Sequence, residues 1–261
     1  MTTTTAQERA ATVIAALVDA IRAEIVTHQV TYDEYTAAKA YLADVGAAGE
    51  WPLFGDVFFE AAVEQVACSG SESSDSTILG PFYLPDSAVL SAPYVMPMRE
   101  AEGGDRLTFS GTVSSSDGTP IAGAVIEMWQ CDHVGSYADI PYPDAREIPP
   151  PGNLRGQFAT DGNGMFEVLT ILPVPYEIPK AGPTGKLLAA AGWHAFRPAH
   201  LHCIVNAEGH SKLITQLYLG GDPYIESDVA SAVKPGLIVP LDKAEDGQGF
   251  ATEHHFRLAK S

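Results

Sequence analysis

Two histidines separated by a single residue, His200 and His202, are the side chains of this sequence that most directly suggest chemistry. Successive side chains of an extended strand point to opposite faces, so both imidazoles would project from one face, close enough to bind the same ion. Pro198 disfavours helix at Arg197, and the apolar residues of 201–205 are typical of a buried strand. The pattern fits a metal site on a rigid strand, and it also fits a strand whose histidines bind no metal.

Tyrosines lie in two proline-rich loops that precede the histidine pair. Residues 131–152 contain Tyr137 and Tyr142, and residues 172–179 hold Tyr176 between prolines that stiffen the backbone. Long, stiff loops usually serve a binding or catalytic site. A loop tyrosine taken alone can equally be a packed ring with its hydroxyl at the surface, so it is the combination with the histidine pair that favours a role in a site.

Helical signals dominate the first part of the chain. Capping boxes begin at Thr5 and Thr31, and each precedes apolar residues at helical spacing. Pro52 can begin a third helix, whose apolar face continues to Ala67. Three such helices form a thin layer that needs the rest of the chain or a second subunit to cover it, so a helical dimer contact is a reasonable hypothesis.

Short alternating runs replace the helical period from about Gly70 onward. Turn signals separate these runs and no helix pattern lies between them, which indicates an all-β sandwich. We therefore predict a mainly β protein with an N-terminal helical region over residues 1–69 and a β-sandwich domain over residues 70–261. Two runs flank the Asp117-Gly118 turn and are expected to form a hairpin-like pair. The expected strands are 107–113 and 124–129 for this pair, then 157–160, 165–168, 199–206 and 213–219.

Composition argues against several classes of partner. The 15 Lys and Arg residues against 33 Asp and Glu residues give a net charge of −18, which repels phosphate backbones and anionic membrane surfaces. Cys68, Cys131 and Cys203 are widely spaced and odd in number, which suits a reducing compartment better than a disulfide framework. No apolar run reaches membrane-spanning length, and the start of the chain lacks the basic residues of a secretory signal. We expect a cytoplasmic protein that binds neither nucleic acid nor membranes.

Several separated motifs occur in the order typical of one enzyme family. They are a Gly-x-Tyr ending at Tyr137, a Pro-x-Pro-Tyr ending at Tyr176, the Arg-Pro-Ala-His-x-His run of residues 197–202, and the Thr-Gln pair ending at Gln216. In these motifs, over about residues 80–222, the sequence resembles the intradiol ring-cleavage dioxygenases of the catechol and hydroxyquinol 1,2-dioxygenase group. The resemblance implies a β-sandwich catalytic domain, N-terminal helices that form a homodimer contact, and one non-haem iron(III) per subunit.

The resemblance also implies roles for individual residues. Two phenolates stabilise a hard trivalent cation against reduction, and neutral imidazoles complete its ligand shell. In the family the second tyrosine leaves the iron and takes a proton as the diol binds, while the arginine stabilises charge on the reacting ring. Tyr142 shares the first loop and remains the alternative to Tyr137 as a ligand. By position, the four ligands would be Tyr137, Tyr176, His200 and His202, with Arg197 and Gln216 beside them.

The substrate pocket is likewise implied by position in the family. Mostly apolar walls suit a flat ring, and Asp56 offers an acceptor to a third hydroxyl. Residues 178–188 are also similar to the hydroxyquinol branch, so we expect hydroxyquinol (benzene-1,2,4-triol) to be cleaved with O2 to 3-hydroxy-cis,cis-muconate and maleylacetate. Catechol or a substituted catechol, giving cis,cis-muconates, is the alternative. The expected pocket residues are Leu53, Asp56, Ile78, Leu79, Gly80, Pro81, Phe82, Ile178, Pro179 and Arg197.

Two functions of other classes fit parts of the sequence. Residues 117–124 resemble a turn of non-catalytic sandwich modules, so a β-sandwich binding domain without chemistry is one alternative. A zinc hydrolase also uses His-x-His, but it needs a further ligand and an activating base, and no convincing set is visible. The loop tyrosines favour the iron enzyme over both.

Overall fold

The computed structural model describes residues 5–140 and 147–261 of the chain. The chain forms two compact units, of which the first ends at Ala48 and the second begins at Gly49. The boundary expected from the sequence lies further along, at residue 70. The sequence prediction assigns the helical residues 51–67 to the N-terminal region, whereas in the structure they belong to the second unit. The division at residue 70 stays a prediction.

The first unit consists of helices α1 (Ala6–Thr27) and α2 (Tyr32–Ala47). Both expected capping boxes are formed. The side chains of Thr5 and Thr31 accept a hydrogen bond from the backbone N–H of Glu8 and Glu34, and the backbone N–H of each threonine donates to the carboxylate of the same glutamate. Within Ala6–Thr27 no residue is buried, and one set of apolar side chains remains exposed. These side chains are Val13, Ile14, Leu17, Val18, Ile21 and Ile25.

The second unit contains three further helices, α3 (Trp51–Phe58), α4 (Glu60–Ala67) and α5 (Pro183–Ala191). The expected third helix is therefore two helices, because Phe59 has φ −130°, outside the helical region. The sequence analysis did not predict α5, although proline at its first turn and Gly192 in the left-handed conformation at its end are ordinary helix signals.

The described residues of the second unit also form two five-stranded sheets and one two-stranded ribbon, and the unit is mainly β. The first sheet has the order β1-β5-β2-β12-β11, with strands Tyr94–Val95, Met165–Ile171, Arg106–Ser115, Phe250–Leu258 and Asp242–Lys243. The second has the order β10-β9-β8-β3-β4, with strands Ile238–Val239, Leu213–Leu219, His200–Asn206, Val125–Trp129 and Arg155–Ala159. The ribbon pairs β6 (Tyr176–Glu177) with β7 (Phe196–Arg197).

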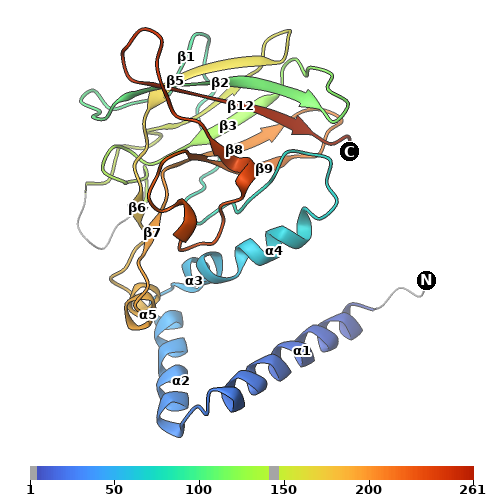
Figure 1. The fold of residues 1–261 in the computed structure, drawn as a ribbon, viewed down its shortest axis with the longest axis vertical. Helices are drawn as coiled ribbons and strands as arrows, with labels where there is room; N and C mark the ends of the chain where they lie inside the picture. Colours follow the sequence, from blue (N-terminus) through green and yellow to red (C-terminus); the bar gives the residue numbers. More distant parts are fainter. Residues whose placement is uncertain (1–4, 141–146) are drawn as a thin grey trace. The chain divides into compact units, whose positions relative to one another are not determined.

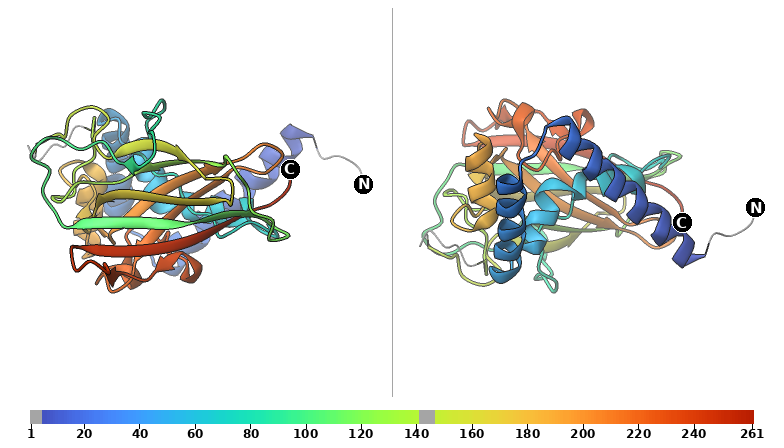
Figure 2. Two further views of the ribbon diagram at one scale, coloured as in Figure 1. Left: turned by 90° about the horizontal axis from the view of Figure 1, so that it is seen from above. Right: turned by 90° about the horizontal axis from the view of Figure 1, so that it is seen from below.

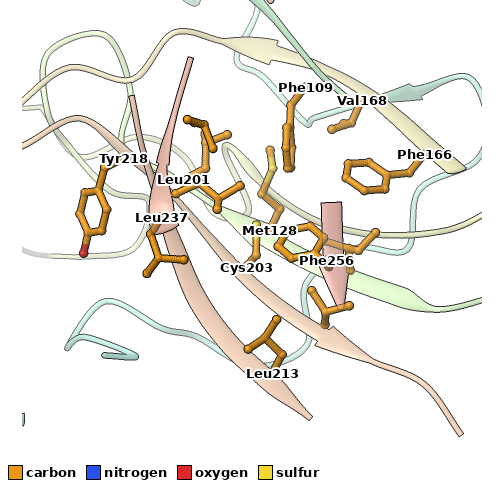
Figure 3. Close-up of a cluster of buried hydrophobic side chains, with 14 of the residues drawn as sticks. Phe109, Met128, Phe166, Val168, Leu201, Cys203, Leu213, Tyr218, Leu237 and Phe256 are labelled. Atoms are coloured by element: carbon orange, nitrogen blue, oxygen red, sulfur yellow. The ribbon is translucent and has the colours of Figure 1, made fainter. Parts of the chain in front are cut away.

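The two large sheets share one hydrophobic core. Figure 1 shows β2, β5 and β12 above β3, β8 and β9, and side chains from both sheets belong to one buried cluster. Alternation within β8 turns Leu201 and Cys203 toward this cluster, as expected for Cys203. The histidines of β8 consequently lie on the outer face of its sheet. Figure 3 shows the cluster, with Phe109, Phe166, Val168 and Phe256 from the first sheet and Met128, Leu201, Cys203 and Leu213 from the second.

The expected hairpin of residues 107–113 and 124–129 is wrong. The Asp117-Gly118 turn is present, since Gly118 has φ +84° and its N–H donates to Ser115. However, β2 pairs with β5 and β12, while β3 pairs with β4 and β8 in the other sheet. Pro120 cannot donate a ladder hydrogen bond and Gly123, at φ +71°, turns the chain again, so it crosses to the second sheet.

The strand β12 was not among the expected strands, yet it occupies the interior of the first sheet. Its nine residues pair in parallel with β2, from Phe250 opposite Leu107 to Leu258 opposite Ser115. Figure 2 shows β12 in red beside β2 in green. The latest strand in the chain and the first long one are therefore neighbours.

Candidate active site

The two histidines of β8 lie as the sequence indicates. Their Nε2 atoms are 3.0 Å apart, and both rings are buried. Neighbouring strands hold them on both sides, because His202 is opposite Trp129 of β3 and Gln216 of β9. The indole of Trp129 stacks on the His202 ring at 4.5 Å between centroids and 11° between planes. The pair is thus fixed on a rigid surface.

The hydrogen bonds of His200 define which nitrogen can bind an ion. Its Nδ1 lies 2.7 Å from the Pro198 carbonyl, which can only accept, so Nδ1 carries the hydrogen and Nε2 presents its lone pair. Burial lowers the pKa of His200 to about 3, and the nearby Arg197 charge acts in the same direction. Burial, followed by the charges around it, also lowers the pKa of His202. Both imidazoles are neutral at pH 7, which is the ligating form.

Two tyrosines converge on the histidines. Tyr137 is fully buried, and its hydroxyl lies 3.3 Å from Nε2 of His200. The ring of Tyr176 is 5.4 Å from the Tyr137 ring and 5.7 Å from the His200 ring, measured between centroids. Tyr142, the alternative ligand, lies outside the described residues, so the choice of Tyr137 stays a prediction.

The donor set fits a hard trivalent cation. Burial raises the pKa of Tyr176 to about 12, although the charge of Arg197 lowers it. A phenol of this kind ionises near neutral pH only when an adjacent cation stabilises the phenolate. The set consists of two phenol oxygens, which become negatively charged on binding, and two neutral imidazole nitrogens. Such a set favours the hard ion iron(III) over softer metal ions.

Three residues hold the Arg197 guanidinium through its Nε and Nη2 atoms. Its Nε and Nη2 donate to the carboxylate of Asp228 at 3.0 and 3.1 Å. Nη2 also lies 2.9 Å from Oε1 of Gln216 and 3.1 Å from the Tyr218 hydroxyl. Nη1 instead lies 3.5 Å from Nε2 of His200. The Nη1 edge of the cation therefore faces one of the candidate metal ligands.

The ribbon and the loop before the first sheet complete this arrangement. Tyr176 and Arg197 are direct cross-strand partners in the β6–β7 ribbon. Gln216 donates from Nε2 to the Ile78 carbonyl at 2.7 Å, which ties the expected pocket loop to β9. Gly80 of that loop has φ +75°, and a Cβ there would be 3.6 Å from the His202 ring. That distance is an ordinary van der Waals contact, so it is the left-handed backbone conformation, rather than a lack of space, that favours glycine here.

A cavity adjoins two of the four candidate ligands, Tyr176 and His202. It leaves about 20 Å³ for the centres of water-sized molecules, which is room for one water. Burial raises the pKa of Asp56 in its wall. Leu79 and Pro179, which were also expected in the pocket, do not line this cavity; the Leu79 N–H donates to Glu60 at 2.9 Å instead. The lining residues are Leu53, Asp56, Val57, Ile78, Gly80, Pro81, Phe82, Tyr176, Ile178, Arg197, His202 and Ala230.

Sequence reasoning missed Asp228, Tyr218 and the wall residues Val57 and Ala230. Asp228 follows a short 3-10 turn and has no local motif, so only its distance from Arg197 reveals its role. Tyr218 lies two residues beyond Gln216 on β9, and the period of two could have placed the two side chains on one face.

A second cluster of possible ligands contains Glu102, Asp132 and His133. Arg99 already occupies it, since its Nη2 lies 3.1 Å from Glu102 and 2.9 Å from Asp132. His133 lies 3.0 Å from Glu102. The cluster is therefore an ion-pair network with its own cation, close to the loop that carries Tyr137.

Comparison with known proteins identifies the family. The family model described as "Dioxygenase" matches residues 78–260, and "Catechol dioxygenase N terminus" matches residues 7–74. The chain belongs to the intradiol ring-cleaving dioxygenases. This confirms the expected enzyme class, and the non-catalytic module and the zinc hydrolase are set aside. Members of the family use non-haem iron(III), for which the donor set above is suited.

The individual relatives are named for different diol substrates. The chain is 44% identical over 233 residues to a chlorocatechol 1,2-dioxygenase of Rhodococcus opacus, covering 88% of this chain and 89% of the relative. It is 38% identical over 255 residues to a hydroxyquinol 1,2-dioxygenase of Rhizobium sp., covering 88% and 82%. Its structure resembles 3-chlorocatechol 1,2-dioxygenase of Rhodococcus opacus 1CP with a TM-score of 0.91 and 47% identity, covering 98% and 100% of the two chains. Among the described residues of this dioxygenase, no helix combines the length and apolar composition needed to cross a bilayer.

Proposed function

We propose that this dioxygenase binds iron(III) through Tyr137, Tyr176, His200 and His202 and cleaves an aromatic 1,2-diol between its hydroxyls. The observation that supports this most directly is the convergence of the two tyrosines on the 3.0 Å histidine pair beside a cavity. The iron, when bound, would hold the diol and make its ring reactive toward O2. The chain's own residues supply orientation, proton acceptance and a dry surrounding.

Each residue near the cavity has a separate task in this proposal. Tyr176 accepts a diol proton at Oη, because its phenolate becomes a strong base once it is separated from a cation in this buried site. Nη1 of Arg197 stabilises negative charge that develops on the ring. Because the cavity holds only about one water, a ring can enter only if lining side chains such as Tyr176 move outward.

A chlorinated catechol is the substrate that the pocket and the relatives favour. The walls are mostly apolar, with Leu53, Val57, Ile78 and Ile178 among them. A chlorine substituent forms no strong hydrogen bonds, so its burial against these walls leaves no polar group unpaired. The relatives at 44% and 36% identity are both named chlorocatechol 1,2-dioxygenases.

Hydroxyquinol is the second candidate, and Asp56 is the observation that favours it. The Asp56 side chain is the carboxylate in the cavity wall, where it can accept a hydrogen bond from a third hydroxyl. A hydrogen bond to a charged group contributes about 1.5–3 kcal/mol, or roughly 10- to 150-fold in kcat/KM. The 38% identity to a hydroxyquinol 1,2-dioxygenase supports the same choice.

Oxygen uptake by the iron-loaded protein tests both levels of the proposal. A functional site should give a visible tyrosinate absorption band and consume O2 with at least one of catechol, 3-chlorocatechol and hydroxyquinol. A colourless loaded protein that consumes no O2 with any of them refutes the proposed function. Asp56→Ala separates the substrates, with Leu53→Ala of the same helix as the control. If hydroxyquinol is the substrate, Asp56→Ala lowers its kcat/KM by about tenfold or more; if chlorocatechol is, Leu53→Ala has the larger effect.

The remaining expectations belong to the same proposal. The shared core supports a β-sandwich as the catalytic domain, and the boundary between the two family matches supports a division near residue 70.

The exposed apolar side chains of α1 support a homodimer through the N-terminal helices, with one iron per subunit. A monomer in sedimentation experiments would contradict the dimer. The net charge of −18 supports a cytoplasmic enzyme without nucleic-acid or membrane partners.

A further inference from the structure

We propose that Asp228 is a positioning residue that fixes the Arg197 guanidinium so that its Nη1 edge alone is directed at the reacting ring. This inference rests on the proposed function, and it concerns a residue that no local sequence motif indicates. Two hydrogen bonds form the anchor, from Nε to Oδ1 at 3.0 Å and from Nη2 to Oδ2 at 3.1 Å. A two-point anchor of this kind removes rotation about the end of the side chain.

Burial makes Asp228 the necessary partner of this cation. The Arg197 side chain is 4% exposed and that of Asp228 is 2% exposed. Among the described residues, Asp228 supplies the one carboxylate that forms an ion pair with Arg197. A buried cation without a counterion is costly, so the guanidinium would turn toward other acceptors if this carboxylate lost its charge. The nearest are Gln216 and Tyr218, which already contact Nη2.

Asp228 also holds the backbone that forms part of the cavity wall. Its Oδ1 accepts from the Ala230 N–H at 3.2 Å and its Oδ2 from the Ala232 N–H at 3.1 Å. Ala230 lines the cavity. One carboxylate therefore sets both the direction of Arg197 and the position of the wall beside it, which fixes the cation relative to a bound ring.

Asp161 provides a matched control elsewhere in the second unit. Its Oδ1 accepts from the backbone two and four residues on, Asn163 and Met165, both at 2.8 Å. Asp228 bonds to the same two backbone positions, but with one oxygen for each. Asp161 is exposed and does not line the cavity. Asp161→Asn therefore reports the loss of a carboxylate charge in a turn of this kind without any change at Arg197.

The experiment is steady-state kinetics of iron-loaded protein with the best diol of the panel. We expect Asp228→Asn to lower kcat by about tenfold or more while KM changes by less than about threefold, since the charge acts on the reacting state. Iron content and the visible band should match the parent, because Asp228 contacts no candidate ligand. Asp228→Glu, which retains the charge, should keep more activity than Asp228→Asn, and Asp161→Asn should behave as the parent.

A double-mutant cycle shows whether Asp228 acts through Arg197. In an Arg197→Ala background, Asp228→Asn should lower kcat much less than in the parent, because the group it positions is gone and only its backbone contacts to Ala230 and Ala232 are still affected. This double variant removes both members of the buried pair, so it avoids the unpaired buried charge that either single variant leaves. Equal losses in both backgrounds, an unchanged kcat in Asp228→Asn, or iron loss in proportion to activity would each overturn the inference. A parent without any diol cleavage would overturn the proposed function as well, whereas a cleaving parent isolates the failure to Asp228.

Discussion

Replacement of Asp132 by asparagine should loosen the loop that presents Tyr137. The Asp132 side chain is fully buried, and three hydrogen bonds converge on it. Oδ2 accepts from Arg99 Nη2 at 2.9 Å, and Oδ1 accepts from the backbone N–H of Val134 at 3.0 Å and of Ser136 at 2.9 Å. The Asp132 N–H donates back to the Ser136 carbonyl at 2.9 Å. One carboxylate thus closes the turn immediately before Tyr137.

The magnitude follows from what the asparagine can still do. Its oxygen can keep both backbone hydrogen bonds, but its amide NH2 would face the Arg99 guanidinium, donor against donor. Breaking a buried ion pair by removing one charge costs about 3–5 kcal/mol. The lower end applies here, because Arg99 is 16% exposed and keeps Glu102 at 3.1 Å. We therefore expect Asp132→Asn to reduce the free energy of unfolding by about 3 kcal/mol.

Urea unfolding of the iron-free protein measures this loss, and iron titration measures its effect at the site. Iron affinity should fall by about tenfold or more, as for other residues that hold a ligand in place. The control is Asp161→Asn, where Oδ1 accepts the same two backbone hydrogen bonds and the side chain is exposed, and it should cost about 1 kcal/mol or less. If Asp132→Asn loses no more stability than Asp161→Asn, or binds iron as the parent does, the reasoning about the loop is refuted.

Two further predictions concern the first tyrosine and the response to acid. Tyr137→Phe should abolish or shift the visible band of the iron-loaded protein, and the reverse result, with Tyr142→Phe colourless and Tyr137→Phe unaltered, would make Tyr142 the ligand. Burial, then the neighbouring His255, lowers the pKa of His254 from 6.5 to about 4, although Asp75 raises it. Between pH 6.5 and 4 the unfolded chain therefore binds more protons than the folded one. The free energy of unfolding decreases by up to about 3 kcal/mol as the pH is lowered through this window. Urea unfolding at pH 7 and 4.5 should show a smaller difference for His254→Gln and an unchanged one for the exposed His28→Gln.

Local patterns were sufficient for some features of the site and not for others. The shared face of His200 and His202 depends only on the period of two in a strand, and both capping boxes are local, so the structure agrees with each. The pairing of residues 107–113 with 124–129 was inferred from their proximity in the chain, and it failed because Pro120 and Gly123 direct the chain into another sheet. Sequence proximity is a weak guide where strands change sheets.

Features that depend on contacts between distant residues needed the structure. Asp228 is 31 positions from Arg197, and nothing around either residue indicates that they pair. The ribbon that places Tyr176 opposite Arg197 consists of two-residue strands, too short for a periodic signal. The family resemblance supplied the expected roles of Tyr176 and Arg197 but not the groups that hold them in place.

The parallel pairing of β12 with β2 has a consequence for how the enzyme is made. β2 lies between β5 and β12, and its register with β12 extends over nine residues up to Leu258. During synthesis β2 leaves the ribosome long before this partner exists, so one edge of it stays open until residues 250–258 have been translated. Backbone groups of residues 74 and 211 likewise bond to those of residues 257 and 259. The first sheet can therefore close only after translation has passed Leu258, and until then the nascent chain depends on solubility or on chaperones to keep that edge from pairing with other chains.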